Sequence, residues 1–226
     1  MKDSISPLDG RYSSETEELL PYFSERALIR YRIKVEIEYL IALSKEKTLV
    51  GLPAFTKKQE ATYRKIYSNF NASTAKEVKK VEQRTNHDVK AVEYYIRSKI
   101  NKSIHPWVHF ALTSEDVNNL SYTLMWRDAL KKVYIPQLTQ VLKDLKTLSN
   151  KYANTAMLSM THGQPATPTT FGKEIRVFVN RIERQTNGID KHRFLGKFGG
   201  ATGTWSAHMV AYPKMNWLRF TKKYIK

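Results

Sequence analysis

Apolar residues recur at every third or fourth position along most of this chain, and this spacing restricts its fold more than any other feature. It is clearest at Leu138, Val141, Leu145 and Leu148, which follow the a/d spacing of helices that pack in a bundle or coiled coil. No alternation of apolar and polar residues, which would indicate a strand, persists for more than a few positions. The sequence therefore predicts an all-α chain with its longest helices in the second half.

The expected helices cover residues 25–47, 57–70, 74–83, 89–100, 113–148 and 168–188. Pro136 lies inside the fifth segment, where its missing amide hydrogen should kink the helix. Thr167 and Pro168 should begin the last helix, as a hydroxyl N-cap followed by proline at the first helical position. The apolar pattern from Trp217 to Ile225 stops without a cap, which indicates that the sequence ends inside a helix or domain.

The chain is strongly basic, with 38 Lys and Arg against 21 Asp and Glu and a net charge of +17. Such a balance is compatible with nucleic acid, a membrane surface or an anionic small substrate. The basic residues are spread along the sequence, however, and solvated helix faces explain them more simply. The absence of cysteine excludes disulfides and thiolate metal sites. No apolar run approaches the ~20 residues of a membrane span, so we expect a cytoplasmic protein without membrane or nucleic-acid partners.

The stretch from Met157 to Glu174 contains the strongest candidate for chemistry, His162. Pro165 and Pro168 fix two φ angles and keep the residues before them out of the helical conformation. His162 should therefore lie on a short, rigid polar loop immediately before a helix. A side chain that titrates near neutrality suits acid–base catalysis at such a place. A histidine that only satisfies loop carbonyls is the equally open alternative.

Three further polar clusters lie at predicted turns or helix starts: Arg11–Tyr12, Asn86–Asp88 and Thr113–Ser114. Capping alone would explain the hydroxyls of the third cluster, and capping by Asn86 or Asp88 would explain part of the second, but not His87. In a bundle of long helices, loops that are distant in sequence can meet at one end or meet a neighbouring subunit. Together with the His162 loop they would form a site for an anionic substrate and proton transfer, with no metal and no cofactor.

The segment Gly196–Gly203 is rich in glycine and is similar to loops that bind phosphate. It matches neither the Walker pattern nor the dinucleotide fingerprint, because no strand precedes it. A tight connection between helices is the expected role.

Five segments resemble the adenylosuccinate lyases of the fumarase/aspartase superfamily, most closely their bacterial-type branch. In order they are Ser6–Tyr12, Thr85–Tyr95, His109–Leu120, Met160–Glu174 and Gly196–His208. The resemblance implies an N-terminal helical domain over residues 1–112, followed by the truncated first part of a central long-helix bundle over residues 113–226. It also implies a homotetramer in which each active site takes residues from three subunits.

The activity that this resemblance implies is a β-elimination in purine biosynthesis. Fumarate is released from adenylosuccinate to give AMP, and from the succinyl-carboxamide imidazole ribotide to give the carboxamide ribotide. His162 matches the general acid, and no cofactor is used. The implied substrate-binding residues are Arg11 and Tyr12 for the phosphate, Asn86, His87 and Asp88 for the phosphate and succinyl regions, Thr113 and Ser114 for a succinyl carboxylate, and Thr161 and Gln164 beside the acid.

One part of the family pattern does not occur in these 226 residues, namely the Ser-Ser-x-Met-Pro-x-Lys-x-Asn loop that carries the catalytic base. We therefore expect the chain to be the N-terminal portion of the enzyme and to be inactive alone, because the carbanion step needs a base. Two alternatives are another fumarate-releasing lyase, such as argininosuccinate lyase, and a basic helical nucleic-acid-binding module.

Overall fold

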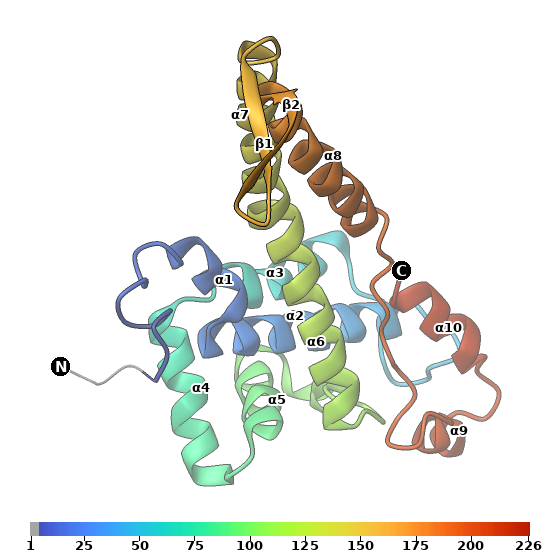
Figure 1. Ribbon diagram of the computed structural model, residues 1–226. Helices are drawn as coiled ribbons and strands as arrows, with labels where there is room; N and C mark the ends of the chain where they lie inside the picture. Colours follow the sequence, from blue (N-terminus) through green and yellow to red (C-terminus); the bar gives the residue numbers. More distant parts are fainter. Residues whose placement is uncertain (1–4) are drawn as a thin grey trace. The chain divides into compact units, whose positions relative to one another are not determined.

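A computed structural model describes residues 5–226, and it is mainly helical, which confirms the predicted class (Figure 1). The chain forms two compact units. The first unit contains Met1–Arg127 and Leu195–Lys226, and the second contains Asp128–Phe194. The division of this chain into domains 1–112 and 113–226 stays a prediction.

Helix α2 (Glu25–Ser44) is the centre of the first unit. It begins where the Ser24 hydroxyl accepts a hydrogen bond from the Ala27 amide. Ile33, Ile37 and Leu40 are almost completely buried, and apolar residues occur on nearly all sides, as is typical of a helix inside a core. Around it lie α1 (Leu20–Phe23), α3 (Lys57–Ser68), α4 (Ala72–Thr85) and α5 (Asp88–Lys99), with short 3-10 helices at Glu17–Leu19 and Lys102–Trp107.

The end of the chain returns to the same core. Residues 195–226 include α9 (Ser206–Ala211) and α10 (Trp217–Tyr224). The ring of Tyr39 on α2 lies 5.3 Å from that of Phe198 and 5.9 Å from that of Phe220, measured between centroids. The core of the first unit is therefore built from two segments that are far apart in sequence.

Helices α6 (Ser114–Ala129) and α7 (Ile135–Lys151) are separated by a π-helical turn at Leu130–Tyr134. Pro136, the second residue of α7, comes directly after this turn. Proline cannot donate to the preceding turn, and a π turn is one way in which a helix accommodates the missing bond. The expected irregularity at Pro136 is thus present as a change of helix type.

The second unit is a helical hairpin closed by a β-hairpin (Figure 1). Helix α7 and helix α8 (Phe171–Asp190) run in opposite directions, and Leu142, Ser149 and Val179 are buried there. Between the helices, β1 (Ala156–Thr161) pairs antiparallel with β2 (Gln164–Thr170). The Ser149 hydroxyl donates to the Gly172 carbonyl (2.8 Å) and joins the two helix ends.

Two predictions for this region were wrong. The stretch expected to be a loop is a β-hairpin, and the last helix begins at Phe171 with Thr170 as its N-cap, not at Pro168 with Thr167 as its N-cap. Pro168 instead pairs with Leu158 in the ribbon. Both strands of a two-stranded ribbon are edge strands, where a proline can be accommodated without a central ladder bond.

Candidate functional site

The segment Asn86–Asp88 forms the junction between α4 and α5. Asn86 ends α4 in the left-handed conformation (φ 48°), and its amide donates to the Glu82 carbonyl. His87 caps α5, because its Nδ1 accepts from the Lys90 amide (3.1 Å). The cap is therefore His87, not Asn86 or Asp88 as the capping alternative assumed. With Nδ1 accepting, Nε2 of this half-exposed ring carries the hydrogen and can donate to an anion.

An open hollow of ≈ 650 Å³ lies beside this junction. It is lined by Lys79, Glu82, Gln83, Asn86, His87 and Asp88. The Lys79 ammonium contacts Glu25 (2.6 Å) and Glu82 (2.9 Å). The amides of Val89 and Lys90 are bonded to Asp88 and His87, so the positive potential at the start of α5 comes from the dipole of the helix, and it favours an anionic ligand.

Asp88, the first residue of α5, forms an ion pair with a buried arginine, Arg32, which was not among the predicted site residues. Nη2 of Arg32 lies 2.7 Å from Asp88 Oδ2, and the Val89 amide donates to Oδ1 (2.8 Å). Partial burial alone would raise the pKa of Asp88, but the Arg32 charge and the Val89 amide lower it below its usual value. Asp88 is therefore an anion at neutral pH.

Thr113 and Ser114 lie at the start of α6, as predicted. The Thr113 amide donates to Oδ2 of Asp116 (3.0 Å). Both residues are partly buried, and within the described part of the chain neither hydroxyl makes a hydrogen bond. Two hydroxyls at a helix start are thus available to a carboxylate.

The glycine-rich loop encloses a carboxylate of its own chain. Asp116 is completely buried and accepts bonds from the Lys197 ammonium (2.9 Å) and from the amides of Gly199 and Gly200 (both 3.0 Å). Asn119 adds two bonds to the backbone of Lys197. The amides that could have bound phosphate are therefore occupied by Asp116. Their role is to fasten the glycine-rich loop to α6.

His109 forms a partly buried ion pair four residues before Thr113. Its Nδ1 lies 2.5 Å from Oε1 of Glu36 on α2, and its backbone has a positive φ of 61°. Burial alone would lower the pKa of His109, but the bond and the charge of Glu36 raise it. The other oxygen of Glu36 has no hydrogen-bond partner in the described part of the chain.

Arg11 and Tyr12 lie in an exposed series of turns. The guanidinium carbon of Arg11 is 5.5 Å from the centre of the Tyr12 ring. The Thr16 hydroxyl donates to the Leu8 carbonyl (3.2 Å) and holds this segment together. Both side chains remain free to contact a ligand.

His162 lies at the tip of the β-hairpin. His162 and Gly163 have φ angles of 48° and 74°, the combination required by a two-residue type I′ turn. Thr161 and Gln164 form the last pair of the ribbon on either side of the turn. All four residues are exposed. His162 does not lie immediately before a helix, as was predicted, because β2 separates this turn from α8. Strand pairing on both sides fixes the turn.

The structure divides the predicted site residues between the two units. Arg11, Tyr12, Asn86, His87, Asp88, Thr113 and Ser114 belong to the first unit, and Thr161, His162 and Gln164 to the second. Within the first unit, Arg32 joins Asp88 to Asn118 on α6. Among the described residues, no group of three His, Asp or Glu side chains has an arrangement that could hold a metal ion.

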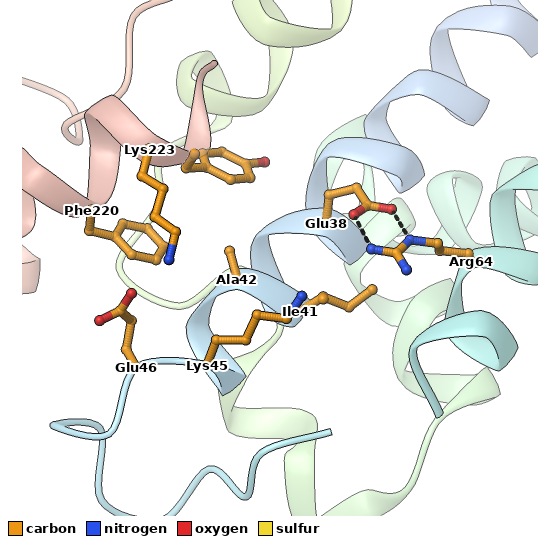
Figure 2. Close-up of a pocket in the computed structure, with 9 residues that line it drawn as sticks. Glu38, Ile41, Ala42, Lys45, Glu46, Arg64, Phe220 and Lys223 are labelled. Carbon is orange, nitrogen blue, oxygen red and sulfur yellow. Dashed lines mark hydrogen bonds and ion pairs between the residues drawn. The ribbon is translucent and has the colours of Figure 1, made fainter. Parts of the chain in front are cut away.

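A second hollow, of ≈ 320 Å³, contains none of the predicted site residues. It lies between α2, α3 and α10, and Figure 2 shows Glu38 and Arg64 bonded to each other on its wall. Lys45 on the same wall pairs with Glu60 (2.9 Å). Lys45 and Arg64 are thus paired with carboxylates, as Lys79 is beside the first hollow, and the two hollows differ in that only the first is lined by predicted site residues.

The charged residues of α2 are the main feature that the sequence analysis missed. Arg32 and Glu36 are one helical turn apart, on the same face of a helix that is otherwise mostly apolar. Buried charges are stable only when they are paired. Charged residues inside an apolar helix could therefore have indicated that a polar partner lies opposite.

Comparison with known proteins places these features in context. A sequence model of a family described as "Lyase" matches residues 10–224. The adenylosuccinate lyase of Dictyostelium discoideum is 45% identical over 99% of this chain and 50% of its own length. That of Escherichia coli (strain K12) is 38% identical over 98% of this chain and 50% of its own length.

Solved structures agree at the level of fold. The fumarate lyase from Mesorhizobium sp. BNC1 superposes with a TM-score of 0.73 at 18% identity, over 92% of this chain and 47% of that one. The β-carboxy-cis,cis-muconate cycloisomerase of Acinetobacter calcoaceticus gives a TM-score of 0.69. The chain thus spans about half the length of the relatives it matches.

Proposed function

The chain belongs to the lyase family, and from this premise we propose that the whole protein is an adenylosuccinate lyase. It would release fumarate from adenylosuccinate to give AMP, and from the succinyl-carboxamide imidazole ribotide to give the carboxamide ribotide. The observation that carries the proposal is the identity of 38–45% to adenylosuccinate lyases over almost all of this chain. The substrates are purine-pathway nucleotides, and the protein works in the cytoplasm.

His162 acts as the general acid in this proposal. A base removes a proton from the carbon next to the C–N bond, and the electron pair left behind forms the double bond of fumarate. The C–N bond breaks, and the departing nitrogen receives a proton from His162. The exposed tip of the hairpin supports this role, because the imidazole is presented on a turn with little backbone freedom.

The helix starts and turns of the first unit bind the anionic groups of the substrate. Arg11 and Tyr12 contact the phosphate, since a guanidinium fork matches phosphate oxygens. His87 donates from Nε2, with Asn86 and Asp88 beside it. Thr113 and Ser114 bind a succinyl carboxylate, supported by their free hydroxyls. Thr161 and Gln164 contact the substrate beside the acid.

The whole protein works as a homotetramer with shared active sites. Apolar side chains are exposed on α7, α8 and the hairpin, among them Val141, Leu148, Met160, Phe171 and Phe178. Exposed apolar surfaces of this kind mark contacts with another chain. A second copy packed there would bury them.

The test is a substrate comparison with the whole purified protein. Fumarate release is measured from adenylosuccinate, argininosuccinate and malate at equal concentrations. We expect fumarate and AMP from adenylosuccinate, with at least 100-fold lower rates for the other two, because the site is built for a nucleotide phosphate. Faster release from argininosuccinate would refute the proposed substrate.

A further inference from the structure

Arg32 joins the two helix starts that carry predicted substrate-binding residues. Its side chain is only 6% exposed, and Nη2 lies 2.7 Å from Asp88 Oδ2 at the start of α5. Its Nε donates to Oδ1 of Asn118 (2.9 Å), one helical turn beyond Ser114 on α6. The guanidinium of Arg32, on α2, therefore contacts α5 and α6 at the same time.

The chemistry of this contact requires an arginine. The guanidinium is planar, permanently charged, and presents its N–H groups in a rigid fork, whereas a lysine has a single point of charge on a flexible stem. Burial of the group is tolerated because Asp88 balances its charge. The Val89 amide holds the other oxygen of Asp88 (2.8 Å), so the carboxylate cannot rotate freely.

Asp88 and Asn118, the two residues that Arg32 contacts, are the anchors of this arrangement, and the predicted substrate-binding residues lie next to them. His87 directly precedes Asp88, and Thr113 and Ser114 lie within five residues of Asn118. If the two anchors moved apart, the His87 ring and the two hydroxyls would no longer have a defined separation. None of these three side chains contacts another of them directly among the hydrogen bonds of the described residues.

We propose that Arg32 is a positioning residue for the lyase reaction. It fixes the starts of α5 and α6 relative to each other, so that their side chains bind one anionic substrate together. Arg32 itself does not contact the substrate. The effect of Arg32 on substrate binding rests on the proposed function, whereas its effect on α5 and α6 rests on the geometry alone.

The experiment compares two arginine-to-lysine variants of the whole protein. Arg32→Lys removes the fork that joins α5 and α6. Arg64→Lys is the control, because the Arg64 guanidinium also makes two bonds to another helix, both to Glu38 on α2 (2.8 and 2.9 Å), but it contacts no predicted site residue. We expect Arg32→Lys to raise KM for adenylosuccinate about tenfold with kcat within about threefold, since it weakens binding that is uniform along the reaction. Arg64→Lys should leave KM within about twofold of wild type.

Amide hydrogen exchange supplies a readout that does not depend on activity. In Arg32→Lys, exchange should accelerate in residues 87–92 and 114–120 together, and in Arg64→Lys in neither segment. An unchanged KM, or faster exchange in only one segment, would overturn the positioning role. A wild-type protein that releases no fumarate from adenylosuccinate would refute the proposed function, and the exchange measurement would still decide whether Arg32 couples the two helices.

Discussion

His162 has a backbone conformation that is uncommon for a residue other than glycine. Its φ of 48° belongs to the left-handed region, where asparagine and aspartate are better tolerated than most side chains. A functional imidazole at such a position is compatible with the tendency of strained residues to lie at active sites. The same feature suggests a substitution that removes the imidazole and keeps the turn.

We expect His162→Asn in the whole protein to lower kcat by about 10²- to 10⁴-fold, the usual contribution of a general acid. KM should change less than about threefold, because the proton is transferred in the transition state. Asparagine is favoured in type I′ turns, so the β-hairpin should persist. Steady-state kinetics check the prediction, with circular dichroism as a control for folding. A variant with normal kcat and raised KM would show that His162 only binds substrate.

A second histidine, His208, has no role in the proposed chemistry and is fully buried. Its Nε2 lies 3.1 Å from the Tyr39 hydroxyl, which donates to the Phe110 carbonyl (3.0 Å). The single hydroxyl hydrogen is used there, so Nε2 must carry its own hydrogen and donate. Nδ1 has no partner in the described part of the chain. The ring is therefore neutral in the folded state.

Burial lowers the pKa of His208 to about 4 from 6.5, although Asp116 opposes the shift. The unfolded chain binds the proton first as the pH falls, so the stability contributed by the neutral ring is complete above pH 6.5 and is lost toward pH 4. The loss from this residue should reach about 3 kcal/mol. Urea unfolding of wild type and His208→Asn between these pH values tests this. The two free energies should converge as the pH falls, and a constant difference would contradict the assignment.

The elements of the second unit depend on one close backbone approach. A Cβ on Gly172 would lie 2.7 Å from the Ala153 backbone and even closer to the Ser149 carbonyl oxygen. Both neighbours are main-chain atoms at the end of α7, and they cannot rotate away as a side chain could. The start of α8 therefore requires glycine for packing, and not for a positive φ.

We expect Gly172→Ala to destabilise the protein by about 1–3 kcal/mol through overpacking. Gly188→Ala in the same helix is the control, since among the described residues no atom beyond the helix's own backbone lies within 4 Å of its added Cβ. It should be neutral or stabilise by up to about 1 kcal/mol, because alanine is the better helix former. Thermal unfolding of both variants gives the comparison. Equal melting temperatures would show that the α7–α8 contact relaxes easily.

The β-hairpin is the element that the sequence could not reveal by pattern. Its strands contain exposed residues on both faces, so they lack the alternation that marks a half-buried strand. Two prolines in β2 also favoured a loop. The local signal that was available is the dipeptide His162-Gly163, since glycine in a two-residue turn is typical of hairpins.

At the scale of the whole molecule, helices were predictable and the pairing of charges was not. Strong apolar spacing placed α2, α3 and α5 within a few residues of their ends. The contacts Arg32–Asp88, Glu36–His109 and Lys197–Asp116 join residues more than 50 positions apart. Such pairs depend on tertiary packing, which the spacing of a single helix does not encode.

Assembly of the whole protein is testable through α8. Phe178 is 57% exposed. If the whole protein forms the proposed tetramer, Phe178→Glu should shift the sedimenting species toward smaller forms, because a buried charge without a partner is costly. Arg184→Gln on the same helix changes the net charge by the same amount and is the control. It should sediment like wild type. A tetramer that persists in the Phe178 variant would place the interface elsewhere.

The split core of the first unit has a consequence for synthesis on the ribosome. Phe198, His208, Trp217 and Phe220 pack with α2, and they are translated after the whole second unit. The apolar surface of α2 around Tyr39 therefore stays uncovered while some 150 further residues are added. Nascent chains with such exposed surfaces are prone to aggregation. Chaperone binding to ribosome-bound chains should accordingly increase after α2 emerges and decline only when residues 198–220 have left the exit tunnel.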